Sequence, residues 1–375
     1  MNYMNKINKI CVYAISKNEE KFARRWYESM KEADAVVVLD TGSTDNTASV
    51  LRSLGATVEV KEIKPWRFDV ARNESLKLVP EDCNILVCTD LDEVLEPGWA
   101  EKLRQAWKPG MQRGEYMYAW SHSKSGEEYR VFKYNKVHSR DWIWVYPVHE
   151  ALWNKNTKTT DYSQEDAIWL PGVKLHHYPD LEKSRGSYLG LLELRELENP
   201  EDLTTKIYLA CEYSYHNLYD KTIDKLNEIL NNYSNSCTGL YRASCYLLAG
   251  DCYAEKGELL KALENYKKAI EADITYREGY IGVASVYLKL KQYETAIIYL
   301  KQGLRNSYRH YSWLERNFSW SWEPYDLLSI CYFYIGKKVE ALGYAIKALS
   351  FDPEDEHLKS NLKLCLDNTS DAEYL

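Results

Sequence analysis

What this 375-residue sequence lacks excludes several classes of protein. It has no basic excess: 48 Lys and Arg stand against 56 Asp and Glu, and the formal net charge is −8. A protein that binds duplex nucleic acid normally carries a basic stripe, so we expect no nucleic-acid partner. No apolar stretch approaches the length of a membrane span. The N-terminus, Met1 to Lys9, is polar and lacks the apolar run of a signal peptide.

Paired cysteines are also missing. The nine Cys are scattered and none form a CxxC pair, which argues against a zinc ribbon and against a dithiol redox motif. An odd number of unpaired Cys and no export signal predict a protein of the reducing cytoplasm.

Aromatic residues are abundant instead, with 32 Tyr and 12 Trp. Such side chains combine a large apolar area with a polar group, so they suit ligand-stacking surfaces and also helix–helix contacts. The length is sufficient for two domains with separate cores. We expect an α/β domain at residues 1–200 and an all-α domain at residues 201–375.

The first half alternates apolar runs with helical patterns, which predicts a mainly parallel sheet covered by helices. Beyond Gly98 the pattern favours antiparallel strands at Glu115–His122 and Glu127–Tyr134. The earlier expected strands are Ile10–Ile15, Ala35–Leu39, Thr57–Lys61 and Asn84–Thr89, and the expected helices are Glu20–Ala33, Thr44–Leu54 (capped by Ser43 or Thr44) and Val70–Leu78. Ligands of such sheets bind beyond the C-terminal strand ends, where Asp40 and Asp90 stand.

From about Leu203 the pattern is helical and repeats. Aligning Ala243 with Arg277 gives a period of 277 − 243 = 34 residues, the tetratricopeptide period. A third unit ends near Pro353, after about 11 inserted residues near Arg309–Trp320, and Leu203–Asn235 resembles a degenerate first unit. Repeat surfaces bind proteins or act as supports. We expect a Tyr-rich concave face to help hold a polypeptide acceptor.

Four polar clusters in the first half occur in a suggestive order. Each alone is compatible with an ordinary turn, cap or loop, but three of them follow predicted strands. They are Ser16-Lys17-Asn18-Glu19-Glu20, Asp40-Thr41-Gly42-Ser43-Thr44-Asp45-Asn46-Thr47, Phe68-Asp69-Val70-Ala71-Arg72-Asn73 and Asp90-Leu91-Asp92-Glu93. In the last cluster, one carboxylate can accept from a ribose hydroxyl while the other holds Mg²⁺ or Mn²⁺, which prefer oxygen ligands and bridge to phosphates. Such a metal neutralises charge on a departing diphosphate.

This ordered set resembles the family-two glycosyltransferases of the GT-A fold, a Rossmann-like mixed sheet. The resemblance extends through Glu128–Phe132, Tyr146–Glu150 and Leu175–Tyr178 to a subgroup that couples this domain to tetratricopeptide helices. Sublancin-type peptide S-glycosyltransferases belong to that subgroup. The resemblance implies a metal-dependent, inverting transfer of a sugar from a nucleoside diphosphate, with UDP favoured, to a peptide or protein.

The resemblance also assigns site residues. Asn18, Glu19, Asp40, Arg72 and Asp90 match positions that bind the nucleotide, with Asp40 at the base and Asp90 at the ribose. Asp92 matches the metal ligand, and His177 matches a late histidine that completes the metal shell. The following Tyr178-Pro179-Asp180 departs from the small residues usual there.

An inverting transfer also needs a proton acceptor. The candidate base is Glu150, after an aromatic run (Trp142, Trp144, Tyr146) that we expect to wall a sugar pocket and to raise the carboxyl pKa by burial. His149 is its rival because its ordinary pKa is already near neutral. Asp141 is a weaker third candidate.

Other functions remain open on sequence grounds. The acceptor is alternatively a glycan, lipid or other small molecule, or the chain is a scaffold with a relic transferase domain. A nucleotidyltransferase would carry a Gly-rich basic phosphate loop near its N-terminus, which Ser16–Glu19 is not. The sequence leaves the oligomeric state open, a homo-oligomer included.

Overall fold

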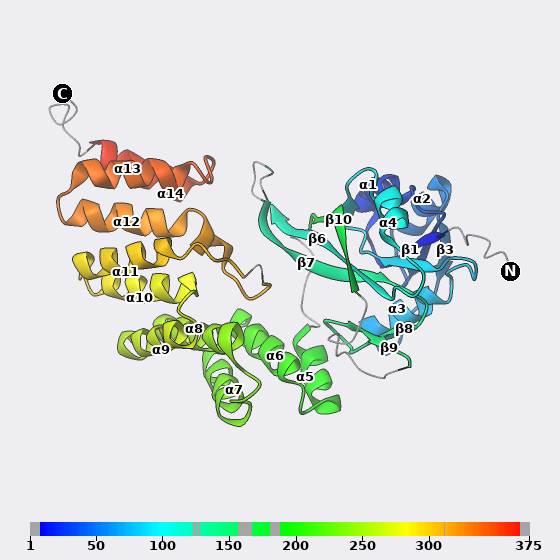
Figure 1. Cartoon of the computed structure of the whole chain (residues 1–375), viewed down its shortest axis with the longest axis horizontal. Coiled ribbons are helices and arrows are strands. Elements are labelled where there is room, and N and C mark those ends of the chain that lie inside the picture. The colour runs from blue at the N-terminus through cyan, green and yellow to red at the C-terminus, as the bar shows by residue number, and fades with distance from the viewer. Residues whose placement is uncertain are drawn as a thin grey trace. The chain divides into compact units, whose positions relative to one another are not determined.

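The computed structural model describes residues 8–122, 126, 128–156, 167–180, 188–310 and 312–367. They divide into two compact units: the first comprises residues up to His122 and from Glu128 to Arg195, and the second runs from Glu196 onward. Figure 1 labels most elements of each unit. An α/β unit followed by helices alone confirms the expected fold class.

The first unit is built on a mixed sheet. Its elements are β1 (Ile10–Ser16), α1 (Glu20–Met30), β2 (Ala35–Asp40), α2 (Thr47–Leu54), β3 (Thr57–Val60), α3 (Phe68–Leu76), β4 (Ile85–Cys88), β5 (Glu93–Leu95), α4 (Trp99–Ala106), β6 (Arg113–His122), β7 (Glu128–His138), β8 (Trp142–Val145), β9 (Ala151–Asn154), β10 (Ala167–His177) and α5 (Tyr188–Glu198), which ends in the second unit. The strand order is β3-β2-β1-β4-β7-β6-β10-β5, with β8 and β9 pairing separately.

The first four strands of this sheet are parallel, and antiparallel pairing begins where β4 meets β7. Strand β1 is buried along its whole length. Its side chains alternate between two cores because successive residues of a strand point to opposite faces. Val12 faces the core that contains Trp26 and Trp99, whereas Tyr13 faces the core that contains Trp142 and Trp144. In Figure 1, α3 lies with β8 and β9, apart from α1, α2 and α4.

The start of α2 differs from the prediction. The helix begins at Thr47, and Asn46 precedes it without a side-chain cap. Ser43 and Thr44 do not cap it because they bind the preceding loop: Oγ of Ser43 accepts from N of Asn18, and N of Thr44 donates to Oδ1 of Asn18. The carboxylate of Asp45 accepts from N of Thr47 at 3.0 Å instead.

Strands β6 and β7 are longer than expected. They run over Arg113–His122 and Glu128–His138, where the sequence predicted Glu115–His122 and Glu127–Tyr134. Glu127 lies outside the described residues. The extension carries β7 through Lys136, which lies outside the strand predicted from the sequence.

The second unit is a stack of antiparallel helix pairs. Its elements are α6 (Leu203–Tyr215), α7 (Tyr219–Asn232), α8 (Gly239–Glu255), α9 (Leu259–Ala272), α10 (Arg277–Lys289), α11 (Tyr293–Arg305), the short 3₁₀ helix η1 (Asn317–Trp320), α12 (Glu323–Tyr334), α13 (Lys338–Leu349) and α14 (Glu356–Asp367). Small residues permit close packing: a Cβ at Gly250 or Gly282 would lie 2.5 or 2.6 Å from the ring of Tyr266.

Residues 306–310 and 312–322, the insertion segment, cross the first helices of successive pairs. These first helices form a row, since α6 contacts α8, α8 contacts α10 and α10 contacts α12. The ring of Trp313 stacks on Tyr208 of α6, with centroids 4.6 Å apart. Arg316 pairs with Asp251 of α8, and Nε1 of Trp320 donates to Glu278 of α10 at 3.0 Å.

The row of first helices is therefore partly covered by the chain's own segment. The insertion near Arg309–Trp320 was predicted from the repeat spacing, but its course was not, because spacing says nothing about where inserted residues fold.

Candidate active site

The common direction of the parallel strands brings three of the four clusters to one edge of the sheet. Strands β1, β2 and β4 are neighbours and run in the same direction, so Ser16 ends beside Asp40, and β4 ends at Cys88, beside Tyr13 of β1. Asp90 follows Cys88 directly after Thr89. Helix α3 adds Arg72 to the same edge through its ion pair with Asp90.

Asp40 is enclosed by its own turn. Its carboxylate accepts from N of Gly42 and from N and Oγ of Ser43, at 3.1, 2.8 and 2.5 Å, and from Oγ of Ser16 at 3.0 Å. The residue is 1% exposed. Gly42 has φ +101°, a conformation that L side chains rarely adopt, so the turn requires glycine here. This arrangement gives Asp40 a clear role in the turn.

Asn18 and Glu19 join the loop after β1 to the loop after β2. Asn18 adopts a left-handed conformation (φ 55°), and its Oδ1 accepts from N of Thr44 at 2.7 Å. N of Glu19 donates to Oγ1 of Thr47 at 2.8 Å. Both residues thereby fix the entrance to α2, next to the turn of Asp40.

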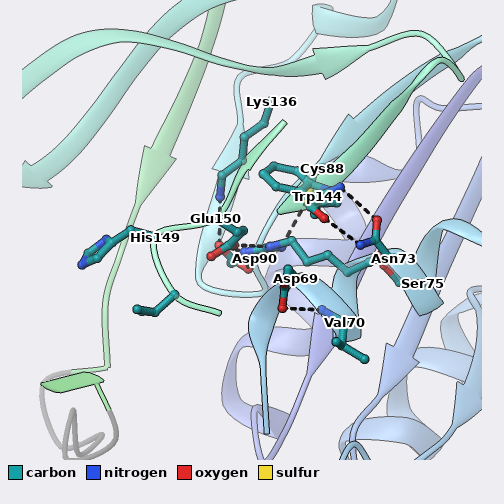
Figure 2. A network of polar contacts seen from close by, with 12 residues as sticks. Asp69, Val70, Asn73, Ser75, Cys88, Asp90, Lys136, Trp144, His149 and Glu150 are labelled. Atoms are coloured by element: carbon teal, nitrogen blue, oxygen red, sulfur yellow. Dashed lines mark hydrogen bonds and ion pairs between the residues drawn. The ribbon is translucent and has the colours of Figure 1, made fainter. Parts of the chain in front are cut away.

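Arg72 lies at the centre of the site. It is 3% exposed, and its Nη2 donates to both carboxylate oxygens of Asp90, at 2.9 and 3.2 Å. Its Nε donates to Oε1 of Glu150, and its Nη1 contacts Sγ of Cys88 at 3.1 Å. The guanidinium carbon lies 5.3 Å from the ring centroid of Trp144. One buried cation therefore holds together α3, the loop after β4 and the loop before β9. Figure 2 labels its partners Cys88, Asp90 and Glu150.

Lys136 and Glu93 complete this network, and neither was predicted from the sequence as a site residue. Nζ of Lys136, from β7, lies 3.1 Å from Oδ2 of Asp90 and 3.9 Å from Oε1 of Glu93. Glu93 is 1% exposed, accepts from the hydroxyl of Tyr118 at 2.5 Å, and accepts from N of Asp90 at 2.8 Å. The one available signal was a third acid directly after Asp90-Leu91-Asp92. Nothing in the sequence identified Lys136.

The two cations set the ionisation of the carboxylates. Burial raises the pKa of Asp90, but the nearby charges of Arg72 and Lys136 outweigh that effect and hold the pKa well below its ordinary value. The pKa of Glu150 is lowered by the same balance. Burial alone would raise this pKa, but the charges of Arg72 and Lys136 have the larger effect and bring it below its ordinary value. Our expectation that burial beside aromatic rings would raise the pKa of Glu150 is wrong, because an arginine lies against the carboxylate.

The expectation that Trp142 and Trp144 line a sugar pocket is also wrong. Trp142 and Trp144 are 1% and 3% exposed and belong to the core beneath the sheet. Nε1 of Trp144 donates to the hydroxyl of Tyr13 on β1 at 2.7 Å. Both rings face the core, so they pack behind the site and do not line it.

His149 and Asp141 are not directed at the carboxylates. His149 has φ 47°, and its ring packs edge-on against Tyr188 with centroids 5.8 Å apart. Figure 2 shows its imidazole pointing away from Asp90 and Glu150. Asp141 is exposed, and its carbonyl accepts from N of Lys155 in the β8–β9 hairpin.

Asp92 and His177 lie against each other. Nε2 of His177 is 3.3 Å from Oδ2 of Asp92. Nδ1 of the same ring faces the carbonyl oxygen of Trp120 at 2.9 Å, and N of Tyr178 donates to the carbonyl of Asp92 at 2.8 Å. Burial lowers the pKa of His177, but the contact with Asp92 outweighs it and raises the pKa overall. A proton donated by Nδ1 to the Trp120 carbonyl leaves Nε2 free to bind a cation beside a carboxylate oxygen.

Comparisons with known proteins agree with this geometry. Residues 11–157 match the model of the glycosyl transferase family 2, and residues 243–273 and 278–308 match the model of the tetratricopeptide repeat. The chain thus carries a family-two glycosyltransferase domain followed by tetratricopeptide repeats, which confirms the predicted enzyme class.

Several solved repeat proteins are similar to the chain. The thermophilic tetratricopeptide protein TTC0263 of Thermus thermophilus is 22% identical, with 48% of this chain and 90% of that chain covered and a TM-score of 0.38. YrrB, described as having an unusual peptide-binding site, is 20% identical over 47% of this chain and 82% of its own, with a TM-score of 0.36. MamA is 18% identical over 47% and 97%, with a TM-score of 0.37. The comparison with curated proteins gave no match. Among the described residues, no helix is both long and apolar enough to cross a membrane.

Proposed function

We propose that this chain transfers a sugar from a UDP-sugar to a peptide or protein, with Mn²⁺ or Mg²⁺ bound at Asp92 and His177. The observation that carries the proposal is the pairing of Nε2 of His177 with Oδ2 of Asp92 at 3.3 Å, two residues after Asp90. An oxygen ligand and an imidazole suit Mn²⁺ well, and carboxylate oxygen suits Mg²⁺. When bound, the metal neutralises charge on the leaving diphosphate.

Asp90 is the proposed ribose contact. Its side chain is 33% exposed, whereas the side chain of Arg72 is 4% exposed. Arg72 and Lys136 therefore act through Asp90: they keep it ionised and aimed, so that it accepts hydrogen bonds from ribose hydroxyls. We assign Arg72 as a positioning residue because it has little surface to offer a nucleotide.

Glu150 is the proposed base. The acceptor hydroxyl or thiol attacks the anomeric carbon as the bond to the diphosphate oxygen breaks. The acceptor proton passes to the Glu150 carboxylate, the diphosphate carries away the bonding electron pair, and the sugar is inverted. The ion pair with Arg72 keeps the Glu150 carboxylate ionised at neutral pH, which is the form that accepts a proton, and makes it a weaker base than a free carboxylate. His149 is the competing base.

The peptide acceptor is proposed on the attached repeats, because tetratricopeptide arrays present extended surfaces to proteins. The insertion segment covers part of the inner row of helices, so the acceptor would use the remainder of the array or the rim of the catalytic unit. A glycan or other small acceptor is the alternative.

The test is nucleotide-sugar hydrolysis by the full chain, with and without Mn²⁺. We expect UDP release from at least one UDP-sugar, its loss in excess chelator, and a decrease of more than ~10²-fold in Asp92→Asn. Glu81→Gln, an exposed acid before β4, is the matched control and should retain activity. Full activity in chelator would disprove the metal assignment.

The acceptor is tested separately. A library of peptides is incubated with the active donor, and each product mass is measured. A mass increase of one sugar on a peptide supports the proposal, whereas transfer confined to added glycans favours the small-acceptor alternative.

A further inference from the structure

A second group of metal-ligating side chains lies on the other face of β10 from His177. Consecutive residues of a strand point to opposite faces, so His176 points away from Asp92. Ligand atoms of Glu96, Glu128 and His176 all lie within 4.8 Å of one another. His122 lies beside this group, with its Nε2 3.0 Å from Nδ1 of His176.

These four residues come from four separate parts of the first unit. Glu96 directly follows β5, His122 ends β6, Glu128 begins β7, and His176 is in β10. No stretch of sequence brings them together, so the sheet itself assembles the group. Lone clusters of surface acids lack this feature, and they also lack imidazoles.

The hydrogen bonding divides the group into an inner and an outer part. Nε2 of His176 lies 3.0 Å from Oε1 of Glu96, so that carboxylate accepts the Nε2 proton and orients the ring with the Nδ1 lone pair towards His122. Nδ1 of His176 then faces Nε2 of His122 at 3.0 Å and Oε1 of Glu128 at 3.9 Å. A carboxylate that holds the outer nitrogen of a metal-binding histidine is a recurrent arrangement, because it fixes the tautomer and raises ligand basicity.

We propose that His122 Nε2, His176 Nδ1 and Glu128 bind a divalent transition metal ion of the zinc type, with Glu96 as the outer partner of His176. Two nitrogens and one carboxylate oxygen are a common zinc ligand set, and the fourth position is left to water. Two nitrogen ligands of a tetrahedral zinc lie ~3.3 Å apart when each bond is ~2.0–2.1 Å. The two rings therefore need to separate by only a few tenths of an ångström from their present 3.0 Å.

One feature opposes binding. Nζ of Lys174 lies 2.8 Å from Oε1 of Glu128, so a metal ion has to displace this ammonium. Removal of Lys174 therefore has different effects in a metal site and in a network of ion pairs alone. In a metal site, removing the lysine frees a ligand and tightens binding, whereas in an ion-pair network it only removes a contact.

The location gives the ion a function. It would tie the end of β6 and the beginning of β7 to β10 and to the residue after β5. Trp120 of β6 accepts from His177 and stacks on it, with centroids 4.5 Å apart, so the ion would stiffen the strand that orients His177.

The experiment is calorimetric titration of the full, chelator-stripped chain with Zn²⁺ alone, repeated on variants. We expect one equivalent to bind with a Kd of ~1 µM or tighter at a site that Asp92→Asn leaves intact. His122→Ala and His176→Ala should each weaken that site by more than ~100-fold, and Glu96→Gln by ~10–100-fold, as for loss of an outer hydrogen-bond partner. Lys174→Gln should tighten it. His216→Ala, an exposed histidine of the second unit, is the matched control and should bind as the wild type does.

A second measurement guards against misfolded variants. Zn²⁺ should raise the melting temperature of the wild-type chain and of Lys174→Gln, but not that of His122→Gln. Equal Zn²⁺ affinity in the wild type and in a folded His122→Ala or His122→Gln chain would overturn the proposal. So would weaker binding in Lys174→Gln. None of these measurements depends on transferase activity, so the proposed function is tested independently.

Discussion

Nη2 of Arg72 contacts both carboxylate oxygens of Asp90, at 2.9 and 3.2 Å, while Nε of the same guanidinium binds Glu150. The planar guanidinium presents its donors in a fixed fork, so it holds the two carboxylates in a set orientation to each other, whereas a lysine ammonium fixes no such plane. The residue that the family resemblance places near the nucleotide thus fixes the two acids proposed to act on ribose and acceptor.

Replacement of Arg72 should destabilise the fold as well as the site. Arg72→Met leaves the Glu150 side chain, 10% exposed, without its cation. We expect the free energy of unfolding to fall by about 3–5 kcal/mol, the usual cost of removing one member of a buried pair. Urea unfolding measures it, and Arg24→Met, on the exposed side of α1, is the control.

The size of this effect should depend on pH. The pKa of Glu150 is lowered in the folded chain, so its contribution is present above the unfolded value of 4.5 and is lost as pH falls through the folded value. The difference between wild type and Arg72→Met should therefore shrink below pH 4.5. A difference that grows on acidification would contradict the ion-pair assignment.

The pH dependence of transfer should identify the base. If Glu150 accepts the proton, the acid limb of kcat/KM lies below pH 4.5, because Arg72 lowers the pKa of that carboxyl. If His149 accepts it, the limb lies near the ordinary histidine value of about 6.5. A limb near 6.5 that disappears in His149→Ala would reassign the base. Glu150→Gln should abolish transfer and spare UDP binding. A thiol acceptor would obscure this limb, because its own ionisation contributes near neutral pH.

Asp40 should prove important first for its turn. Asp40→Ala removes the acceptor of hydrogen bonds from Ser16, Gly42 and Ser43 in a residue that is 1% exposed. We expect the melting temperature to fall, since each buried donor left unpaired costs about 1–3 kcal/mol. UDP affinity, measured by calorimetry below the transition, should weaken as well. If stability were unchanged and UDP affinity were lost, Asp40 would instead contact the uracil base of the nucleotide directly.

Glu278 should make the stability of the repeats depend on pH. Burial raises its pKa from 4.5 to about 7, although Trp320 and N of Arg316 bind its Oε1. Because the pKa of Glu278 is raised in the folded chain, its contribution to the free energy of unfolding is fully present below pH 4.5. This contribution is lost as pH rises through 7. The loss should reach about 3 kcal/mol by pH 8, at 1.36 kcal/mol per pKa unit.

Glu278→Gln should remove this part of the pH dependence in urea unfolding of the full chain. Glu340→Gln, an exposed acid on α13, should retain it. An equally steep pH dependence in Glu278→Gln would show that other groups cause it.

The parts of the site that follow from strand ends could be predicted from sequence. Asp40, Asp90 and Asp92 were found because buried apolar runs stop just before them, and the 34-residue period located the repeats. Lys136 and Glu93 were missed because a buried ion pair leaves no periodic trace; β7 alternates, and only the folded sheet brings Lys136 to Asp90. Trp142 and Trp144 were misplaced because a Trp in a strand has the same pattern whether it faces a ligand or a core.

The insertion segment has a mechanical consequence. It contacts Tyr208, Asp251 and Glu278, which belong to three successive helix pairs, and so links these pairs across the coil that the stacked helices form. A helical stack without such a brace lengthens and bends like a spring as the pairs rotate against each other. Here any stretch of the coil must first break a ring stack, an ion pair or a hydrogen bond. These three helix pairs should therefore resist pulling as a single rigid block.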